Sequence, residues 1–160
     1  MRAAKRIALA LVVCASAPRA MGSESPAKFV PANVLQSDIR KAPEQSQGIA
    51  LVSYLREPGY SASVVRRTRP GNAEIHKNVA DVWYVVAGEA TLVTGGSLSG
   101  GRETEPGELR GGGISGGAAR HIGTGDFISI PAGVPHWVSA VAGKELIYLV
   151  VKVKTITHAR

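Results

Sequence analysis

Twelve residues near the C-terminal end constrain the fold of this chain more than any other stretch: Gly125-Asp126-Phe127-Ile128-Ser129-Ile130-Pro131-Ala132-Gly133-Val134-Pro135-His136. Gly125-Asp126 predicts a turn, Phe127 to Ile130 a short apolar strand, and Pro131 to Gly133 a second turn. The second turn delivers His136 to the start of a further strand. A histidine fixed between a rigid turn and a strand has few conformations to lose on binding, so His136 is a candidate ligand.

A second informative stretch lies upstream and reads Glu74-Ile75-His76-Lys77-Asn78-Val79-Ala80-Asp81-Val82-Trp83-Tyr84-Val85-Val86-Ala87-Gly88. Residues two apart on a strand share a face, so Glu74, His76 and Asn78 are predicted to point the same way. By the same rule Trp83 and Tyr84 point to opposite faces, one into the core and the other outward.

The two stretches resemble the two sequence motifs of the cupin superfamily. The second motif is a glycine, five residues, a proline, one residue, a glycine, two residues and a histidine, and every key position is met. The motif residues are Gly125, Pro131, Gly133 and His136.

The first cupin motif is met in part. It has two histidines one residue apart, then three or four residues, an acidic residue, six residues and a glycine. Asp81 and Gly88 satisfy its end, but a single histidine, His76, stands where the family has two. If His76 is the second of the pair, Glu74 holds the first position. If His76 is the first, Asn78 holds the second and the gap to Asp81 shrinks to two residues.

The resemblance implies an all-β fold, a single cupin barrel (a double-stranded β-helix, or jelly roll) with a short N-terminal arm. The strand pattern agrees with a sandwich or barrel, because short apolar runs alternate with Pro/Gly turns and helical periodicity is nearly absent. The runs are 49–55, 60–67, 73–76, 82–87, 90–94, 127–130, 137–141 and 146–153. We expect the barrel to span residues 49–154 and a tail to span 155–160.

Residues 95–117 are expected to form a glycine-rich loop between the two motifs, since they hold ten of the nineteen glycines. A loop of this length in a compact domain is either functional or disordered. Two interpretations remain open here, a lid across the barrel mouth and a flexible linker.

Residues 1–22 have the form of a secretory signal peptide, with a basic start, an apolar core from Ile7 to Val13 and small residues for cleavage. Residues 23–48 are expected to form the arm, with a short helix at 34–41 as one option. The expected location is therefore outside the cytoplasm, periplasmic or extracellular, with no membrane contact after the signal is removed.

Removal of the signal changes the charge. It takes four of the 19 basic residues and no acid, which leaves 15 against 12 acidic residues. This small excess, together with export, argues against a nucleic-acid partner. The only cysteine, Cys14, leaves as well, so we expect no disulfide or thiol chemistry in the mature chain.

The cupin resemblance implies a metal bound by His76, Asp81 and His136, with Glu74 or Asn78 as a further candidate ligand. Iron, manganese, nickel, copper and zinc all accept two imidazoles and a carboxylate. Other interpretations remain for each residue: His136 as a structural residue at a turn, and Asp81 as a turn residue before the strand at Val82. His121 and His158 are expected at the surface.

Two functions are expected from different classes. The first is an exported metal-binding cupin that acts on a small organic molecule, as an oxygenase or isomerase. The alternative is a non-enzymatic module whose barrel binds a sugar or another small ligand and whose metal site is degenerate. A structural or storage protein is a third hypothesis. The resemblance also implies a homodimer as a candidate assembly. Among Arg66, Arg67 and Arg69, any that faces inward is a candidate to bind an acidic substrate.

Overall fold

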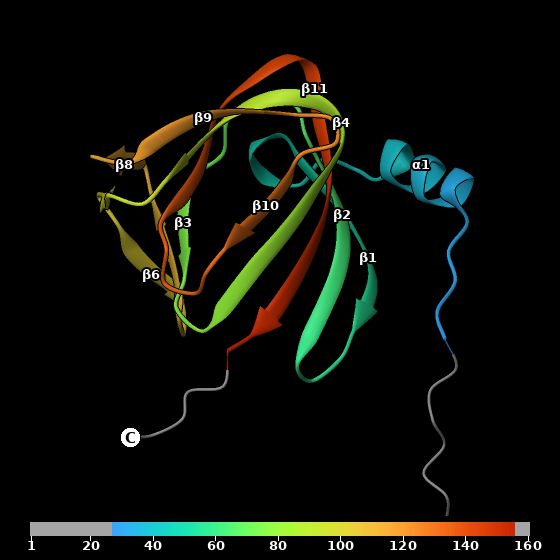
Figure 1. The fold of residues 1–160 in the computed structure, drawn as a ribbon, viewed down its shortest axis with the longest axis horizontal. Coiled ribbons are helices and arrows are strands. Elements are labelled where there is room, and N and C mark those ends of the chain that lie inside the picture. The colour runs from blue at the N-terminus through green and yellow to red at the C-terminus, as the bar shows by residue number, and fades with distance from the viewer. Residues whose placement is uncertain (1–26, 156–160) are drawn as a thin grey trace, which may run out of the picture.

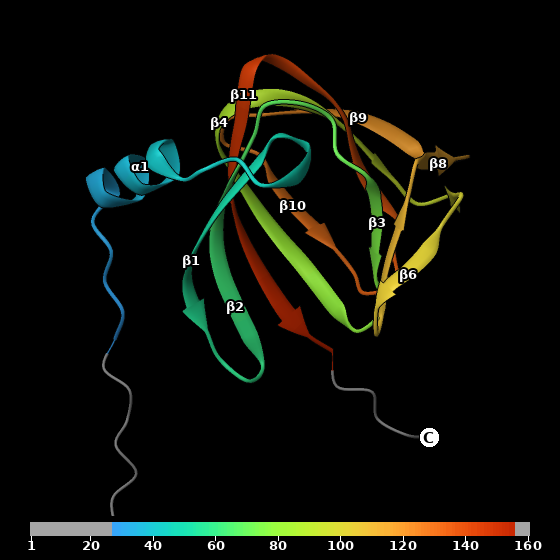
Figure 2. The ribbon, with the colours of Figure 1, turned by 180° about the vertical axis from the view of Figure 1, so that it is seen from behind.

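The computed structural model describes residues 27–155, and within them antiparallel strands form a barrel (Figures 1 and 2). The expected signal segment, residues 1–22, and all but the first residue of the expected tail lie outside the described residues. The described part contains no helix that is long and apolar enough to cross a membrane. The elements are α1 (Ala32–Lys41), η1 (Ser46–Gly48), β1 (Ile49–Arg56), β2 (Tyr60–Arg67), β3 (Ala73–His76), β4 (Val79–Thr94), β5 (Ser97–Ser99), β6 (Arg102–Glu105), β7 (Glu108–Gly111), β8 (Gly113–Ser115), β9 (Ala118–Gly123), β10 (Phe127–Ile130) and β11 (His136–Lys154).

Two long strands, β4 and β11, form the centre of the barrel. They run antiparallel, and each continues through a point where the sequence predicts a turn: Gly88-Glu89 in β4 and Ala142-Gly143 in β11. The register explains this result. Between the paired positions Ala142↔Glu89 and Ile147↔Ala87, four residues of β11 lie opposite Gly88 alone. Such a bulge bends the strands without ending them.

The interior of the barrel follows the period of two that a strand imposes. On β4, Trp83 and Val85 are buried while Tyr84 is 50% exposed, so Trp83 is the core residue of the predicted alternating pair. Trp83 stacks on Tyr148 of β11 with ring centroids 4.4 Å apart. The main core also contains Val65, Ala90, Leu92, Ile122, Ile130, Val138, Leu146 and Val150.

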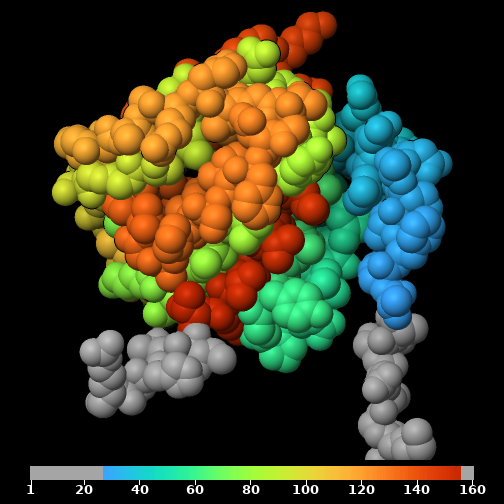
Figure 3. All heavy atoms as spheres, viewed as in Figure 1, coloured from blue at the N-terminus to red at the C-terminus, as the bar shows by residue number. Residues whose placement is uncertain are grey.

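Helix α1 lies on the outside of the barrel beside β1 and β2 (Figure 3). Ile39 of the helix packs against Ala50, Val64 and Ile147 in a second, smaller core. Arg66 points outward from β2 and donates hydrogen bonds to the carbonyls of Ile39 and Ala42, each 3.3 Å long. Arg66 therefore satisfies carbonyls at the end of the helix that have no partner within it.

The segment 95–117 differs from the glycine-rich loop that the sequence predicts, because it contains the four short strands β5 to β8. β5 pairs with β8, and β6 and β7 pair with each other. β7 also pairs with β3, so the segment extends the barrel wall next to His76. Its glycines serve tight turns between these strands. At Gly96, for example, φ is +69° and a Cβ atom would lie 2.3 Å from the carbonyl oxygen of Ser115.

We predict that Gly88→Ala destabilises the fold more than Gly125→Ala does. Both glycines have positive φ, +82° and +95°, so both substitutions carry the left-handed backbone cost of about 1–2 kcal/mol. A Cβ atom at position 88 would also lie 2.0 Å from the carbonyl oxygen of Glu145, whereas nothing lies within 4 Å at position 125. We expect Gly88→Ala to lose at least about 1–3 kcal/mol more, as overpacking does.

Urea unfolding followed by tryptophan fluorescence measures both variants. Equal losses for the two would contradict this explanation of the bend at Gly88.

Candidate metal centre

The candidate centre is built from three strands that face the barrel interior. Glu74 and His76 lie on one face of β3, Asp81 is on β4, and His136 is the first residue of β11. In the sheet register His136 lies directly opposite Glu74. The turn before His136 is tied to β3, since the backbone N–H of Gly133 donates to the carbonyl of His76 at 2.8 Å. This bond joins the two sequence motifs at the site itself.

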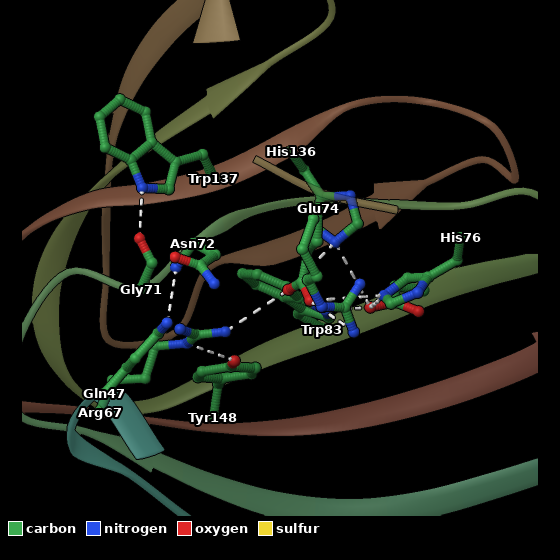
Figure 4. Close-up of polar contacts among 12 residues, drawn as sticks. Gln47, Arg67, Gly71, Asn72, Glu74, His76, Trp83, His136, Trp137 and Tyr148 are labelled. Carbon is green, nitrogen blue, oxygen red and sulfur yellow. Dashed lines mark hydrogen bonds and ion pairs between the residues drawn. The ribbon is translucent and has the colours of Figure 1, made fainter. Parts of the chain in front are cut away.

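The four side chains converge on one point, and Figure 4 shows Glu74, His76 and His136 directed toward one another. The ligand atoms of these three all lie within 4.8 Å of one another. Nε2 of His136 is 3.5 Å and Nε2 of His76 is 4.0 Å from the Glu74 carboxylate. The Asp81 carboxylate is 3.7 Å from Nε2 of His76 and 3.9 Å from Nε2 of His136. Two ligand atoms each about 2.1 Å from one metal lie at most about 4.2 Å apart, so every one of these four separations is compatible with a shared ion.

Hydrogen bonds to the Nδ1 atoms fix the tautomer and the orientation of the two imidazole rings. Nδ1 of His136 is 3.1 Å from the carbonyl of Val134, which only accepts, so this nitrogen carries the proton. Nδ1 of His76 is 2.6 Å from the Glu108 carboxylate. Burial, followed by the charge of Lys152, lowers the pKa of His76 and favours its neutral form. Both rings thus direct an Nε2 lone pair into the site, as metal-ligating histidines do.

His136 provides the clearest sign that the site receives a further group. The residue is 1% exposed, and its Nε2 is the buried side-chain polar atom that lacks a hydrogen-bond partner within residues 27–155. An unsatisfied buried polar atom costs about 1–3 kcal/mol. Two imidazole nitrogens and two carboxylates are a donor set that transition metals accept. The residues present therefore fit a divalent metal.

Glu74 is held ionised by its neighbours. Burial opposes its ionisation, yet the charges of Arg67 and Arg110 hold its pKa well below the usual range. The two guanidinium groups act in this direction whatever the protonation of His136. Arg67 is the inward-facing arginine of the three considered from sequence; it is 3.5 Å from Glu74 and donates a 2.9 Å hydrogen bond to the hydroxyl of Tyr148.

Lys152 completes the site and was missed from the sequence. It lies directly opposite Asp81 in the register of β4 and β11. Its ammonium is 2.8 Å and 3.1 Å from the two Asp81 oxygens and 2.7 Å from Nε2 of His76. A signal was available, because Leu146, Tyr148 and Val150 alternate inward on this strand and Lys152 continues their face.

A cleft of about 690 Å³ gives access to the site, a size within the range of small-molecule pockets. Its wall includes Glu74, His76 and Lys152, and its rim includes Arg56 and Thr104. A smaller hollow of about 180 Å³ continues to the floor formed by Asp81, Trp83 and Tyr148.

The other residues considered from sequence lie away from the centre. β3 ends at His76, so Asn78 is exposed on a turn and does not share the face of Glu74, contrary to the prediction. His121 is exposed and lies 3.5 Å from Glu89. Trp137 points away from His136 and donates a 2.8 Å bond to the carbonyl of Gly71 (Figure 4). His158 lies outside the described residues.

Solved structures with the same fold include several cupins. Streptomyces PAC13 with uridine is 13% identical, with a TM-score of 0.52, over 84% of this chain and 86% of that one. KdgF from a Halomonas species is 18% identical, with a TM-score of 0.50, over 71% and 88%. Recombinant oxalate oxidase in complex with glycolate is 20% identical, with a TM-score of 0.51, over 76% of this chain and 59% of that one.

These likenesses show the fold: the chain folds as a single β-barrel of the jelly-roll type seen in cupins, as the sequence motifs predict. Searches against protein-family models and against curated protein sequences give no match.

We predict that Arg67→Met destabilises the protein by about 2–4 kcal/mol, because removing one partner of a buried ion pair leaves the other uncompensated. Arg110 still contacts Glu74 at 3.3 Å, which limits the loss. The matched control is Arg69→Met, at an exposed position of the same segment, with an expected change within about 0.5 kcal/mol. Chemical denaturation measures both; similar values for the two variants would show that Arg67 has no structural role at the site.

Proposed function

We propose that the protein is an exported cupin that binds a divalent transition metal through His76, His136, Glu74 and Asp81 and acts on a small organic molecule. The observation that carries the proposal is the buried, unpartnered Nε2 of His136, directed at the same point as Nε2 of His76 and two carboxylates. When bound, such a metal polarises a substrate oxygen or activates oxygen or water.

The chain's own residues prepare this site for chemistry. The two neutral imidazoles and two carboxylates supply a net charge of −2, which matches a divalent cation. Glu108 and the Val134 carbonyl hold the rings in the ligating tautomer. Arg67 and Tyr148 form a buried wall behind Glu74 and fix its position. The reaction depends on this site, because the mature chain lacks cysteine and offers no serine at a nucleophile elbow. Ser115 has the Gly-x-Ser-x-Gly spacing, but it is the last residue of β8 and precedes strand β9, so it does not lie at the strand-to-helix turn that such an elbow requires.

The cleft supports a small molecule as the substrate. Its volume suits a metabolite-sized compound, and two proteins with this fold were solved with small molecules, uridine and glycolate. Oxygenase and isomerase chemistry are the reaction types we propose, since both use a metal with positions left open by the protein.

A second candidate function is a non-enzymatic module that binds a sugar or another small ligand. One observation favours it: the Lys152 ammonium already contacts His76 and Asp81, two of the proposed metal ligands. In this alternative the cleft binds its ligand without a metal.

Elemental mass spectrometry of mature protein purified without an affinity tag tests whether the protein binds a metal. We expect about one iron, manganese, nickel, copper or zinc per chain in the wild type, and none in His136→Ala, because loss of a buried imidazole removes a ligand that no neighbour replaces. His121→Ala is the matched control, since His121 is exposed, and it should retain the wild-type content.

Two further variants separate the candidate ligands on either side of His76 in the sequence. Glu74→Ala should lose metal, whereas Asn78→Ala should not, because Asn78 is exposed on the turn. Unchanged metal content in His136→Ala would contradict the site. A wild-type protein that takes up none of the five ions after reloading would favour the binding-module function.

Export is the remaining part of the proposal, and it rests on the form of residues 1–22. The intact mass of the protein recovered from the exported fraction tests it. We expect a mature chain that begins after Ala17 or after Gly22, because Ala15-Ser16-Ala17 and Ala20-Met21-Gly22 both supply small residues for cleavage. Full-length chain retained in the cytoplasm would contradict export while leaving the metal site unaffected.

A further inference from the structure

The position of Lys152 at the centre points to a role that the metal proposal alone does not include. Its ammonium lies between a proposed nitrogen ligand and a proposed carboxylate ligand, 2.7 Å from His76 and 2.8 Å from Asp81. Because Nδ1 of His76 faces Glu108, Nε2 is the nitrogen that accepts from the lysine. The same lone pair is the one a metal would require.

Lys152 is able to leave this position. Its side chain is 36% exposed, whereas Asp81 and His76 are 3% and 5% exposed. The lysine also lines the open cleft. A long side chain anchored near the end of β11 can move its ammonium into the cleft without any change of the strand, while its two partners are fixed in the barrel wall.

We propose that Lys152 is an internal cation that competes with the metal for His76 and Asp81, so that a metal ion binds only by displacing the lysine into the cleft. This inference deepens the proposed function, since it concerns the same site. Lys152 would then set the affinity of the site for the metal. Once the lysine is displaced, its ammonium would lie in the cleft beside the metal.

The electrostatics support the competition. A buried carboxylate needs a compensating charge, and in the structure Lys152 gives it to Asp81, with a 3.2 Å hydrogen bond from Nε1 of Trp83 in addition. A divalent metal would provide the same compensation. The lysine and the metal therefore stabilise the same carboxylate, and each makes the other unnecessary.

The test compares zinc affinity in the wild type, Lys152→Met and Lys154→Met by isothermal titration calorimetry. Zinc is the probe because it accepts nitrogen and oxygen ligands without redox chemistry. We expect Lys152→Met to bind zinc at least about tenfold more tightly than the wild type, which corresponds to about 1.4 kcal/mol. Lys154→Met removes the same charge from an exposed position two residues further along β11 and should match the wild type.

Thermal unfolding of the same proteins gives a second readout. Without metal, Lys152→Met leaves Asp81 without its cation and should melt below Lys154→Met. With saturating zinc this difference should shrink, because a ligand that binds the folded state more tightly stabilises it more.

A measurement on the wild type keeps the inference testable if Lys152→Met fails to fold. Acetylation by a water-soluble acylating reagent, mapped by mass spectrometry, reports the exposure of each lysine. With zinc added, we expect labelling of Lys152 to rise about tenfold relative to that of Lys154. Equal labelling with and without zinc would overturn the displacement.

The outcomes separate this inference from the proposed function. If the wild type fails to bind zinc and Lys152→Met binds it, the inference stands, and the metal content of the wild type with the other four ions decides the proposed function. If both bind zinc with equal affinity, the metal site stands and the inference falls. If neither binds zinc, the inference falls, and the proposed metal site falls with it only if the wild type also takes up none of the other four ions.

Discussion

The site depends on one geometric constraint: β11 has to bend back so that its two ends face the same interior. His136 and Lys152 are sixteen residues apart, which is about 50 Å along a straight strand. In the barrel both reach His76, with 5.1 Å between the rings of His76 and His136 and 2.7 Å from Lys152 to the ring nitrogen of His76. The bulge opposite Gly88 provides the bend, so a backbone feature of β4 determines which side chains meet.

Charge balance in the interior follows from this geometry. Glu74 is compensated by Arg67 and Arg110, and Asp81 is compensated by Lys152. Buried charges are stable only when paired, so these contacts allow two carboxylates to lie close together without a metal. His136 has no such partner at Nε2. Among the buried side-chain polar atoms of residues 27–155, Nε2 of His136 is thus the one without a hydrogen-bond partner, and it lies 3.5 Å from Glu74, which lines the cleft.

The sequence predicted the parts of this arrangement that are local. Turn chemistry placed His136 after its turn, the period of two placed Trp83 and Tyr84 on opposite faces of their strand, and the motif spacing indicated the barrel. The prediction that Asn78 shares a face with Glu74 and His76 was wrong, because β3 and its pairing with β7 both end at His76. The alternation of Leu146, Tyr148 and Val150 could have placed Lys152 on the inward face, but its contact with Asp81 arises from the register of β4 and β11, which sequence spacing does not reveal. The strands within residues 95–117 were missed because three to four residues each are too few for a clear period of two, although β5 pairs with β8 and β6 with β7 inside the segment.

The most direct test of this account is anomalous X-ray diffraction from a crystal of the wild-type protein loaded with zinc. We expect one anomalous peak within bonding distance of Nε2 of His76 and Nε2 of His136, next to the Glu74 carboxylate, with the Lys152 ammonium displaced into the cleft. A peak elsewhere on the protein, or no peak with Lys152 still bound to His76 and Asp81, would contradict it.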